Sequence, residues 1–549
     1  MPSQHWVTAR AVAGEAATAP PSSGAWSDTP FRREDWAACF ATQPEEFEYW
    51  VQDEDIEGEV PQDLKGTLFR NGPGNFERGG QRFRHYLDGD GYVSAFSLVG
   101  GRVHYRSRYV RTEEFGREEE EDRVGYRTTF GTQREGGPLA NAFDFKLKNS
   151  ANTSVVDWGG QLLCMYEAGV PHRLDRHTLA TLGPSSLGGL VREGMPFTTK
   201  LGGEVDAALG LGHAVTAHFH EDPHRQRLVG WAWGANVNPA NGLAATDLVL
   251  NMYEFGAGWE VLAEREEVLP RCPLAPHDFA LSEGWAVMFQ NPLDFNPVPY
   301  AFGLKGPAEC LNFSAGAPMV AHMIPRGGGA RVSIPLPPHF LIHHANAWED
   351  ADGTVNIVSS GWGGEYIRPD AGSAGILGSW ETVLEGDFST IPRTNTWLTR
   401  LHPATGEGTV ELIMERCGEH PHVNPLFAML ESRYYYIGAA PTRDTAAPPQ
   451  ATVRLDGRSG EQVVFLAGDR VFTEEPIVVP RGGAEDPEDF VWVLQVHYDA
   501  EAGRSGLAIF DGQRVADGPV ARVWLRHAIP HGLHGAYGEY AGPQGDSET

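Results

Sequence analysis

The stretch TSVVDWGGQLLCMY, residues 153–166, carries the pattern that decides the fold class. Two short runs rich in β-branched and apolar residues, Thr153–Val156 and Leu162–Tyr166, lie on either side of the pair Gly159-Gly160. Because two consecutive glycines accept the left-handed backbone of a tight turn, this stretch predicts a β-hairpin. Similar turn signals recur along the chain, which contains 66 glycines and 39 prolines. Many successive hairpins indicate an all-β protein, and a sandwich, a barrel and a propeller are all compatible with this pattern.

Charge and cysteine usage restrict the partners and the compartment. The formal net charge of −30 argues against nucleic acid as a partner and against electrostatic docking on anionic lipid. No run of 18 apolar residues occurs, so no membrane-spanning helix is expected. Five scattered cysteines without a CxxC pair favour buried thiols in a reducing, cytoplasmic compartment. They are Cys39, Cys164, Cys272, Cys310 and Cys417.

The N-terminal segment differs in composition from the rest of the chain. Residues 1–35 are expected to form a disordered or weakly ordered tail, and residues 36–549 a single β domain. The first 25 residues are rich in Ala, Ser and Pro and contain no apolar core of a secretory signal. A transit segment for an organelle such as the plastid stays open as an alternative.

Four histidines stand in short motifs that suggest a metal site. A neutral imidazole is a good ligand for divalent first-row metals, iron(II) among them. Successive members of the set are 59, 66 and 191 residues apart, so only the fold can bring them together. Taken singly, each of the 21 histidines is more often a core or surface residue than a ligand. The motifs are Ala217-His218 with Asp222-Pro223, His277-Asp278-Phe279, His343 with Asn346-Ala347, and Gly532-Leu533-His534-Gly535.

These four contexts together resemble the carotenoid cleavage oxygenases. Further stretches resemble signatures of that family in the same order, and the likeness runs from about Trp36 to about Tyr537. They are Gly66–Gly74, His85–Gly91, Ala151–Ser154 and Glu475–Pro480. The resemblance implies a seven-bladed β-propeller with extended loops and a few short helices that form a cap over the metal face.

The resemblance also implies the composition of the metal site. Fe(2+) would be held by His218, His277, His343 and His534, and three glutamates would hold the second ring nitrogen of ligands. The glutamates are carried over as Glu167, Glu419 and Glu475. Glu419 is followed by His420-Pro421-His422, where relatives usually have Phe-Pro-Arg. Four other histidines compete for ligand roles but lack the motif context: His213, His220, His344 and His531.

The activity implied by the resemblance is oxidative cleavage. An iron(II) dioxygenase of this family uses O2 to cleave a conjugated C=C bond of a carotenoid or apocarotenoid into two carbonyl products. Stilbene-cleaving relatives have a Lys before the first glutamate and a Tyr near the tunnel. Here Tyr166 takes the first position and Phe115 is assigned to the second, which disfavours stilbenes. The isomerase branch of the family is not singled out by any residue.

Two readings from a different class stay open. One is a metal-binding propeller without catalysis, and the other is a calcium-dependent lactonase. A four-histidine set disfavours calcium, which prefers oxygen ligands.

An apolar segment suggests how a long, apolar substrate is acquired. Residues 298–305, continuing to Cys310-Leu311, carry few charges and precede a second apolar run at 317–320. Relatives use such insertions as a lip that dips into membrane, so peripheral membrane contact through Tyr300, Phe302 and Leu304 is expected. A packed loop over the propeller face is the alternative. The sequence makes no prediction of oligomeric state.

Overall fold

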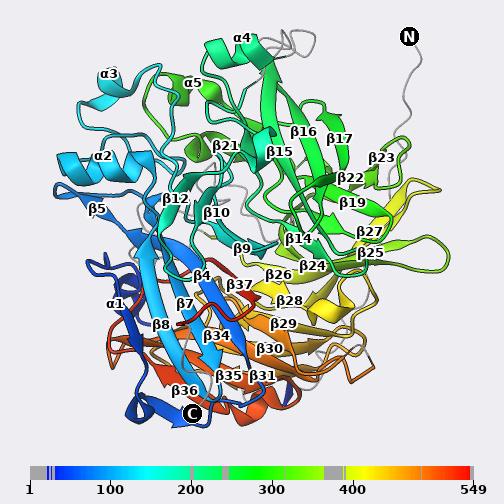
Figure 1. Ribbon diagram of the computed structural model, residues 1–549. Coiled ribbons are helices and arrows are strands. Elements are labelled where there is room, and N and C mark those ends of the chain that lie inside the picture. The colour runs from blue at the N-terminus through cyan, green and yellow to red at the C-terminus, as the bar shows by residue number, and fades with distance from the viewer. Residues whose placement is uncertain are drawn as a thin grey trace.

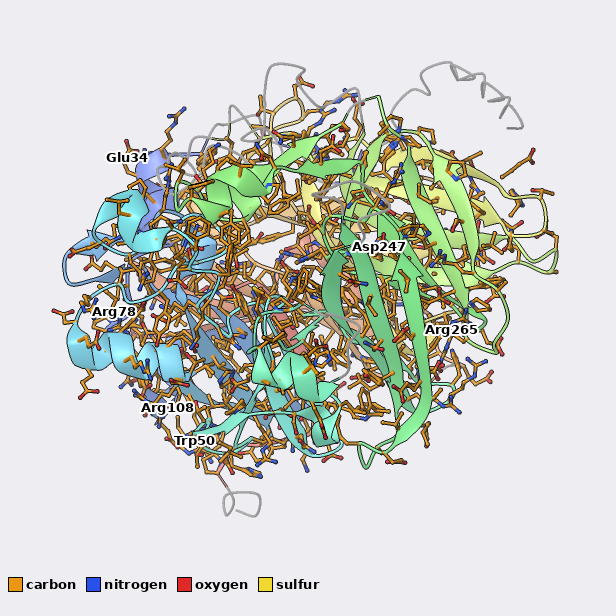
Figure 2. All side chains as sticks on the ribbon, turned by 90° about the horizontal axis from the view of Figure 1, so that it is seen from above. Glu34, Trp50, Arg78, Arg108, Asp247 and Arg265 are labelled. Atoms are coloured by element: carbon orange, nitrogen blue, oxygen red, sulfur yellow. The ribbon has the colours of Figure 1, made fainter. Side chains whose placement is uncertain are left out.

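The computed structural model describes residues 22–23, 26, 31–197, 203–237, 246–314, 316–363, 388, 391–483 and 485–543. Within these residues, seven sheets of four or more strands are arranged in a ring (Figures 1 and 2). The fold is therefore a seven-bladed β-propeller, which confirms the predicted fold class. Most of the predicted N-terminal tail lies outside the described residues.

The blades follow one another along the chain, each built mainly of antiparallel neighbours. Blades 1 and 2 contain β2 (Glu48–Trp50), β4 (Gly66–Asn75), β7 (Asp90–Val99), β8 (Arg102–Tyr109) and β37 (His534–Gly538), then β9 (Ser154–Trp158), β10 (Gln161–Met165), β11 (His172–Leu174) and β12 (Thr181–Pro184). Blades 3 and 4 contain β13 (Ala214–Val215), β14 (His220–Asp222), β15 (Arg227–Val237), β16 (Thr246–Phe255) and β17 (Val261–Leu269), then β18 (Ala280–Leu281), β19 (Trp285–Gln290), β22 (Met319–Pro325) and β23 (Val332–Leu336).

The remaining blades complete the ring. Blades 5 and 6 contain β24 (His339–Glu349), β25 (Val355–Gly363), β26 (Asn395–His402) and β27 (Glu407–Met414), then β28 (Gly418–His422), β29 (Tyr434–Ala439), β30 (Ala451–Asp456), β31 (Gln462–Leu466) and β1 (Ser22–Ser23). Blade 7 contains β32 (Val471–Thr473), β33 (Ile477–Pro480), β34 (Val491–Asp499), β35 (Arg504–Asp511), β36 (Ala521–Trp524) and β3 (Ile56–Gly58). Two small hairpins stand apart, β5 (Glu77–Arg78) with β6 (Gln81–Arg82) and β20 (Leu293–Phe295) with β21 (Leu311–Phe313).

The predicted hairpin is the start of blade 2. Strand β9 pairs with β10 so that Trp158 lies opposite Gln161, and only Gly159 and Gly160 form the turn. Their φ angles of 54° and 73° lie in the left-handed region, which a two-residue hairpin turn of this twist requires. The pair of glycines therefore has the role that the sequence pattern predicts.

Both ends of the chain contribute to closing the ring. The last strand, β37, pairs with β4 of blade 1, and His534 lies opposite Asn71. The early strand β3 pairs with β36 and completes blade 7. A C-terminal strand thus completes blade 1 and an N-terminal strand completes blade 7, so the chain itself ties the first and last blades together.

Apolar side chains fill the spaces between neighbouring blades. The largest core cluster joins residues of blades 1 and 7, and others join blades 2 with 3 and 4 with 5. Figure 2 shows the densely packed side chains around the ring. The short helices α2 (Glu113–Glu121), α3 (Gly137–Asn141), α4 (Gly203–Ala208) and α5 (Pro297–Ala301) lie on one face as a cap (Figure 1), and α1 (Arg33–Ala38) lies beside the ring. None of the helices in the described parts of the chain is long and apolar enough to cross a membrane.

Candidate metal centre

Each blade sends one predicted site residue toward the same central position. The four histidines come from blades 1, 3, 4 and 5, and the three glutamates come from blades 2, 6 and 7. The histidines are His534 at the start of β37, His218 between β13 and β14, His277 before β18, and His343 within β24. The glutamates are Glu167 after β10, Glu419 in β28, and Glu475 between β32 and β33. The propeller thus assembles a site from segments far apart in sequence.

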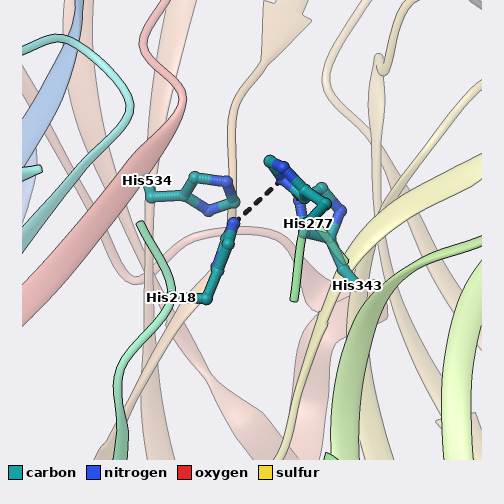
Figure 3. A group of neighbouring side chains, drawn as sticks. All are labelled: His218, His277, His343 and His534. Carbon is teal, nitrogen blue, oxygen red and sulfur yellow. Dashed lines mark hydrogen bonds between the residues drawn. The ribbon is translucent and has the colours of Figure 1, made fainter. Parts of the chain in front are cut away.

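The four imidazoles present their nitrogen atoms to one another (Figure 3). Their ligand atoms all lie within 4.8 Å of one another. The Nε2 of His277 lies 2.9 Å from that of His218 and 3.2 Å from that of His343. Nitrogens bound at about 2.1 Å to one ion are about 3.0 Å apart at right angles and about 4.2 Å apart on opposite sides. The donor set therefore fits a divalent metal ion in both chemistry and spacing.

A glutamate holds the far ring nitrogen of three of the histidines. The Nδ1 atoms of His277, His343 and His534 lie 2.6, 2.9 and 2.8 Å from carboxylate oxygens of Glu167, Glu419 and Glu475, respectively. An ionised carboxylate accepts a hydrogen bond, so each Nδ1 carries the proton and each Nε2 is left free to bind a metal. His218 has no carboxylate partner within the described residues.

The surroundings of the centre favour an ionised Glu475 and a neutral His218. Burial raises the pKa of the Glu475 carboxyl, but the charge of His534 and hydrogen bonds from His422 and His534 outweigh it and hold this pKa well below its usual range. Burial lowers the pKa of His218 far below its ordinary value, against the opposing charge of Asp278. A neutral imidazole is the form that binds a metal.

An interior space reaches the centre. Glu167 and His277 lie deep in the protein, yet 33% and 22% of their side-chain surfaces are accessible. Accessible surface this deep in a propeller means that the blades do not close completely over the histidines. The accessible surface leaves room for small molecules beside the histidines.

The four competing histidines make contacts away from the four candidate ligand nitrogens. His344 follows His343 but faces the opposite side of β24, where its Nδ1 lies 2.7 Å from Ser359 Oγ. The ring of His531 packs against Trp36 at 5.1 Å between centroids. His220 lies 2.7 Å from Asp278, and His213 Nδ1 accepts a hydrogen bond from the Arg192 backbone.

The motif residues beside the ligands connect blades. Asp278, next to His277, contacts His220 of blade 3 and accepts a hydrogen bond of 2.8 Å from the backbone of His344 in blade 5. Asp222 accepts a hydrogen bond of 2.7 Å from Arg326, which directly follows β22 of blade 4. The motifs therefore hold adjacent blades in register, which keeps the ligand nitrogens at a common point.

Two residues at the centre were not predicted from the sequence. The ring of His420 lies 4.9 Å from that of His343 and 4.8 Å from that of His534. His422 Nε2 donates a hydrogen bond of 3.0 Å to Glu475, the same carboxylate that holds His534. Their only signal in the sequence was the His-Pro-His departure from the usual family pattern after Glu419.

The prediction for Phe115 was wrong. This residue is 3% exposed, stacks on Tyr109 and belongs to the core shared by blades 1 and 7, so it does not line the centre. Tyr166 does precede Glu167, and its hydroxyl lies 2.5 Å from Thr129 Oγ1.

Only some residues of the predicted apolar lip are exposed. Phe302 and Leu304 are 51% and 55% exposed, as expected. Tyr300 is held inward, because Arg127 lies over its ring and its hydroxyl donates to the Phe145 carbonyl. The second apolar run is also misassigned, since its end, Met319-Val320, begins β22 in blade 4. Cys310 and Leu311 are buried.

Other exposed residues join Phe302 and Leu304. Phe143, 65% exposed, has its ring 5.4 Å from that of Phe302, and Leu139 in α3 is 95% exposed. Val298 in α5 is 57% exposed. We call Leu139, Phe143, Val298, Phe302 and Leu304 the apolar patch.

Comparison with known proteins agrees with the resemblance. The family model of the retinal pigment epithelial membrane protein matches residues 40–539. The apocarotenoid-15,15'-oxygenase of Synechocystis sp. is 35% identical over 95% of this chain and 99% of its own length. The chloroplastic carotenoid cleavage dioxygenase 7 of Oryza sativa subsp. japonica is 28% identical over 88% of this chain and 87% of its own. The crystal structure of cobalt-substituted Synechocystis ACO superimposes with a TM-score of 0.81 at 34% identity, covering 92% of this chain and 99% of that one. The chain belongs to the family of the retinal pigment epithelial membrane protein, the carotenoid cleavage oxygenases.

Proposed function

We propose that this protein is an iron(II) dioxygenase that cleaves a conjugated C=C bond of an apocarotenoid or carotenoid with O2, giving two carbonyl products. The observation that carries the proposal is the convergence of four histidine nitrogens within 4.8 Å, three of them oriented by glutamates. The similarity to an apocarotenoid-15,15'-oxygenase over 95% of the chain supports this substrate class.

In this proposal each group of the chain has a stated role. His218, His277, His343 and His534 hold the iron, and four neutral ligands leave its 2+ charge uncompensated, which favours iron(II) at rest. When bound, the iron supplies reactivity toward O2. Glu167, Glu419 and Glu475 keep the Nδ1 protons in place and so fix the ring orientations. The interior space beside Glu167 and His277 receives the polyene.

The alternatives have less support. A stilbene-cleaving enzyme would need a Lys before the first glutamate to grip a phenol, but that position is Tyr166, whose hydroxyl bonds Thr129. A calcium lactonase needs oxygen ligands at the metal, whereas the convergent donors are imidazole nitrogens. A scaffold without catalysis and the isomerase branch are favoured by no feature of the site.

Metal analysis combined with a substrate panel tests the proposal. The purified protein should contain about one iron per chain and should convert an apocarotenal or carotenoid into carbonyl products only in the presence of O2. Products are identified by mass. Calcium in place of iron, or bound iron with no cleavage of any polyene, would contradict the proposal.

We also propose that the apolar patch contacts a lipid surface. The protein would do so in a reducing compartment such as the cytoplasm. Its five members are between 51% and 95% exposed and come from two segments that lie side by side. The net charge of −30 gives no electrostatic attraction to anionic lipid, so contact would depend on apolar insertion. A bilayer is the occupant that fits, because long polyenes partition into its hydrocarbon core.

A further inference from the structure

Strand β28 brings three side chains to the centre within four residues. Glu419 bonds His343, His422 bonds Glu475, and His420 lies between them with its ring near those of His343 and His534. His420 takes part in none of the three histidine–glutamate pairs. The hydrogen-bond partners of Glu419 and His422 explain the positions of these two residues, whereas His420 has no such partner in the described part of the chain.

The backbone at His420 is strained in a way that directs this side chain. Its φ of 53° lies in the left-handed region, and the pairing of β28 with β29 shifts register between Glu419 and His422. A regular strand would place consecutive side chains on opposite faces. A left-handed non-glycine residue costs about 1–3 kcal/mol, and such strain is concentrated at functional sites. The irregularity allows Glu419 and His420 to reach the centre together.

The ring of His420 lacks a hydrogen-bond partner in the part of the chain that the structure describes. Its backbone N–H contacts Glu419 at 3.3 Å, and its imidazole lies beside the rings of His343 and His534. By contrast, the rings of His343, His422 and His534 each bond a carboxylate. The His420 side chain is partly exposed, so its ring nitrogens are available to a molecule that enters the centre.

We propose that His420 hydrogen-bonds a carbonyl oxygen of the molecule that occupies the centre, and that it thereby favours aldehyde ligands. The inference rests on the proposed cleavage, which places a new carbonyl oxygen on each carbon of the broken double bond at this position. A neutral imidazole offers one N–H donor for such an oxygen. The residue His420 is only partly exposed, deep in the protein, which is consistent with a wall of the interior space. Relatives with Phe at this position would lack the donor.

Equilibrium binding of two matched probes tests the role of His420. The metal-loaded protein is titrated without O2 with a C20 polyene aldehyde and with the corresponding polyene hydrocarbon, and quenching of tryptophan fluorescence is measured. His420→Phe keeps a ring of similar size but removes the donor, so aldehyde binding should weaken about three- to tenfold while hydrocarbon binding stays unchanged. His420→Gln restores an N–H donor and should bind the aldehyde nearly as tightly as the wild type.

Three outcomes would overturn the inference. The first is an equal loss of affinity for both probes, and the second is no loss of affinity for either. The third is loss of metal from the His420→Phe variant, which would mean that His420 helps to hold the metal ligands in place. Cleavage of an apocarotenal by the wild type tests the proposed function separately. A wild type that cleaves, beside a Phe variant that binds both probes normally, rejects only the role of His420.

Discussion

At the scale of single residues, the adjacent histidines His343 and His344 point to opposite faces of β24. His343 faces the centre and bonds Glu419 through Nδ1, whereas His344 turns to Ser359 on the other face of β24. The alternation of side chains along a strand explains the difference. The family spacing to Asn346-Ala347 selects the first of the two, and the geometry agrees with that selection.

This pair provides a matched test of the ligand assignment. His343→Ala removes one of four nitrogens and the imidazole that Glu419 orients, so we expect metal content and oxygen-dependent cleavage to be lost together. His344→Ala changes the same residue type one position away and should retain about one metal per chain. Metal analysis of both purified variants decides the matter, and equal metal content in the two would reject His343 as a ligand.

A buried histidine far from the centre should limit acid stability. Burial, reinforced by the charge of Arg522, lowers the pKa of His497 in β34 to about 3. In the unfolded chain this group titrates near 6.5, so it gains a proton there before the folded protein does. Stability is therefore complete above pH 6.5 and falls as the pH drops toward 3, by roughly 3 kcal/mol at pH 4 from this group alone.

Chemical denaturation between pH 4 and 7 measures this effect. His497→Gln removes the titration, so its loss of stability on acidification should be smaller than that of the wild type. The exposed His177→Gln variant is the control and should follow the wild type. Parallel pH profiles for all three proteins would show that His497 is not responsible.

At the scale of elements, one buried arginine organises the apolar patch. Arg127 is fully buried and donates hydrogen bonds to the backbone carbonyls of Asn141 and Asp144 and of Tyr300 and Lys305. It thus ties the α3 segment to the α5 segment. The run Val298–Leu304 indicated an apolar lip from the sequence alone, but Phe143 lies more than 150 residues away from Phe302. The spacing of apolar residues in the sequence could not predict that Phe143 lies beside Phe302, because Arg127 holds their two segments together in the fold.

The same limit applies to β28 at the centre. Glu419 could be predicted because it stands in a motif, and the ligand histidines because their flanks and order are distinctive. His420 could not, because its approach depends on a left-handed backbone and a register shift that ordinary strand alternation does not suggest.

The apolar patch should bind bilayers independently of salt. Phe143, Phe302 and Leu304 changed together to Ser remove much of its exposed apolar surface, and we expect co-sedimentation with liposomes to drop. Binding of the wild type should persist from 0.1 to 1 M salt, although the Debye length shrinks from about 10 to about 3 Å.

A matched control separates this surface from exposed apolar residues in general. Leu182, Leu262 and Leu430 are 53%, 47% and 44% exposed in other blades, and their joint change to Ser should leave binding intact. A wild type that never sediments, or equal binding by the patch variant, would contradict membrane contact through these residues.

At the scale of the whole molecule, the site and the closure of the ring depend on the same strand. His534 is both a candidate ligand and the first residue of β37, which closes blade 1 against β4. The hairpins in the sequence predicted an all-β protein, but the number of blades came from the family resemblance. Unequal strand lengths explain why no repeat was visible, since β24 has 11 residues and β11 has only three.

Because four blades share one candidate ion, metal binding should stabilise the entire ring. The ligands span His218 to His534, so unfolding of blade 1, 3, 4 or 5 would remove a ligand. A ligand that binds only the folded state at 100 times its Kd adds about 2.7 kcal/mol. We expect iron(II) or cobalt(II) to raise the Tm of the chelator-treated protein by a few degrees, measured by calorimetry without O2. His343→Ala should show no such rise, while His344→Ala should show it in full. If the metal binds the wild type stoichiometrically but leaves its Tm unchanged, the ion is not held by the four blades together and the shared site is wrong.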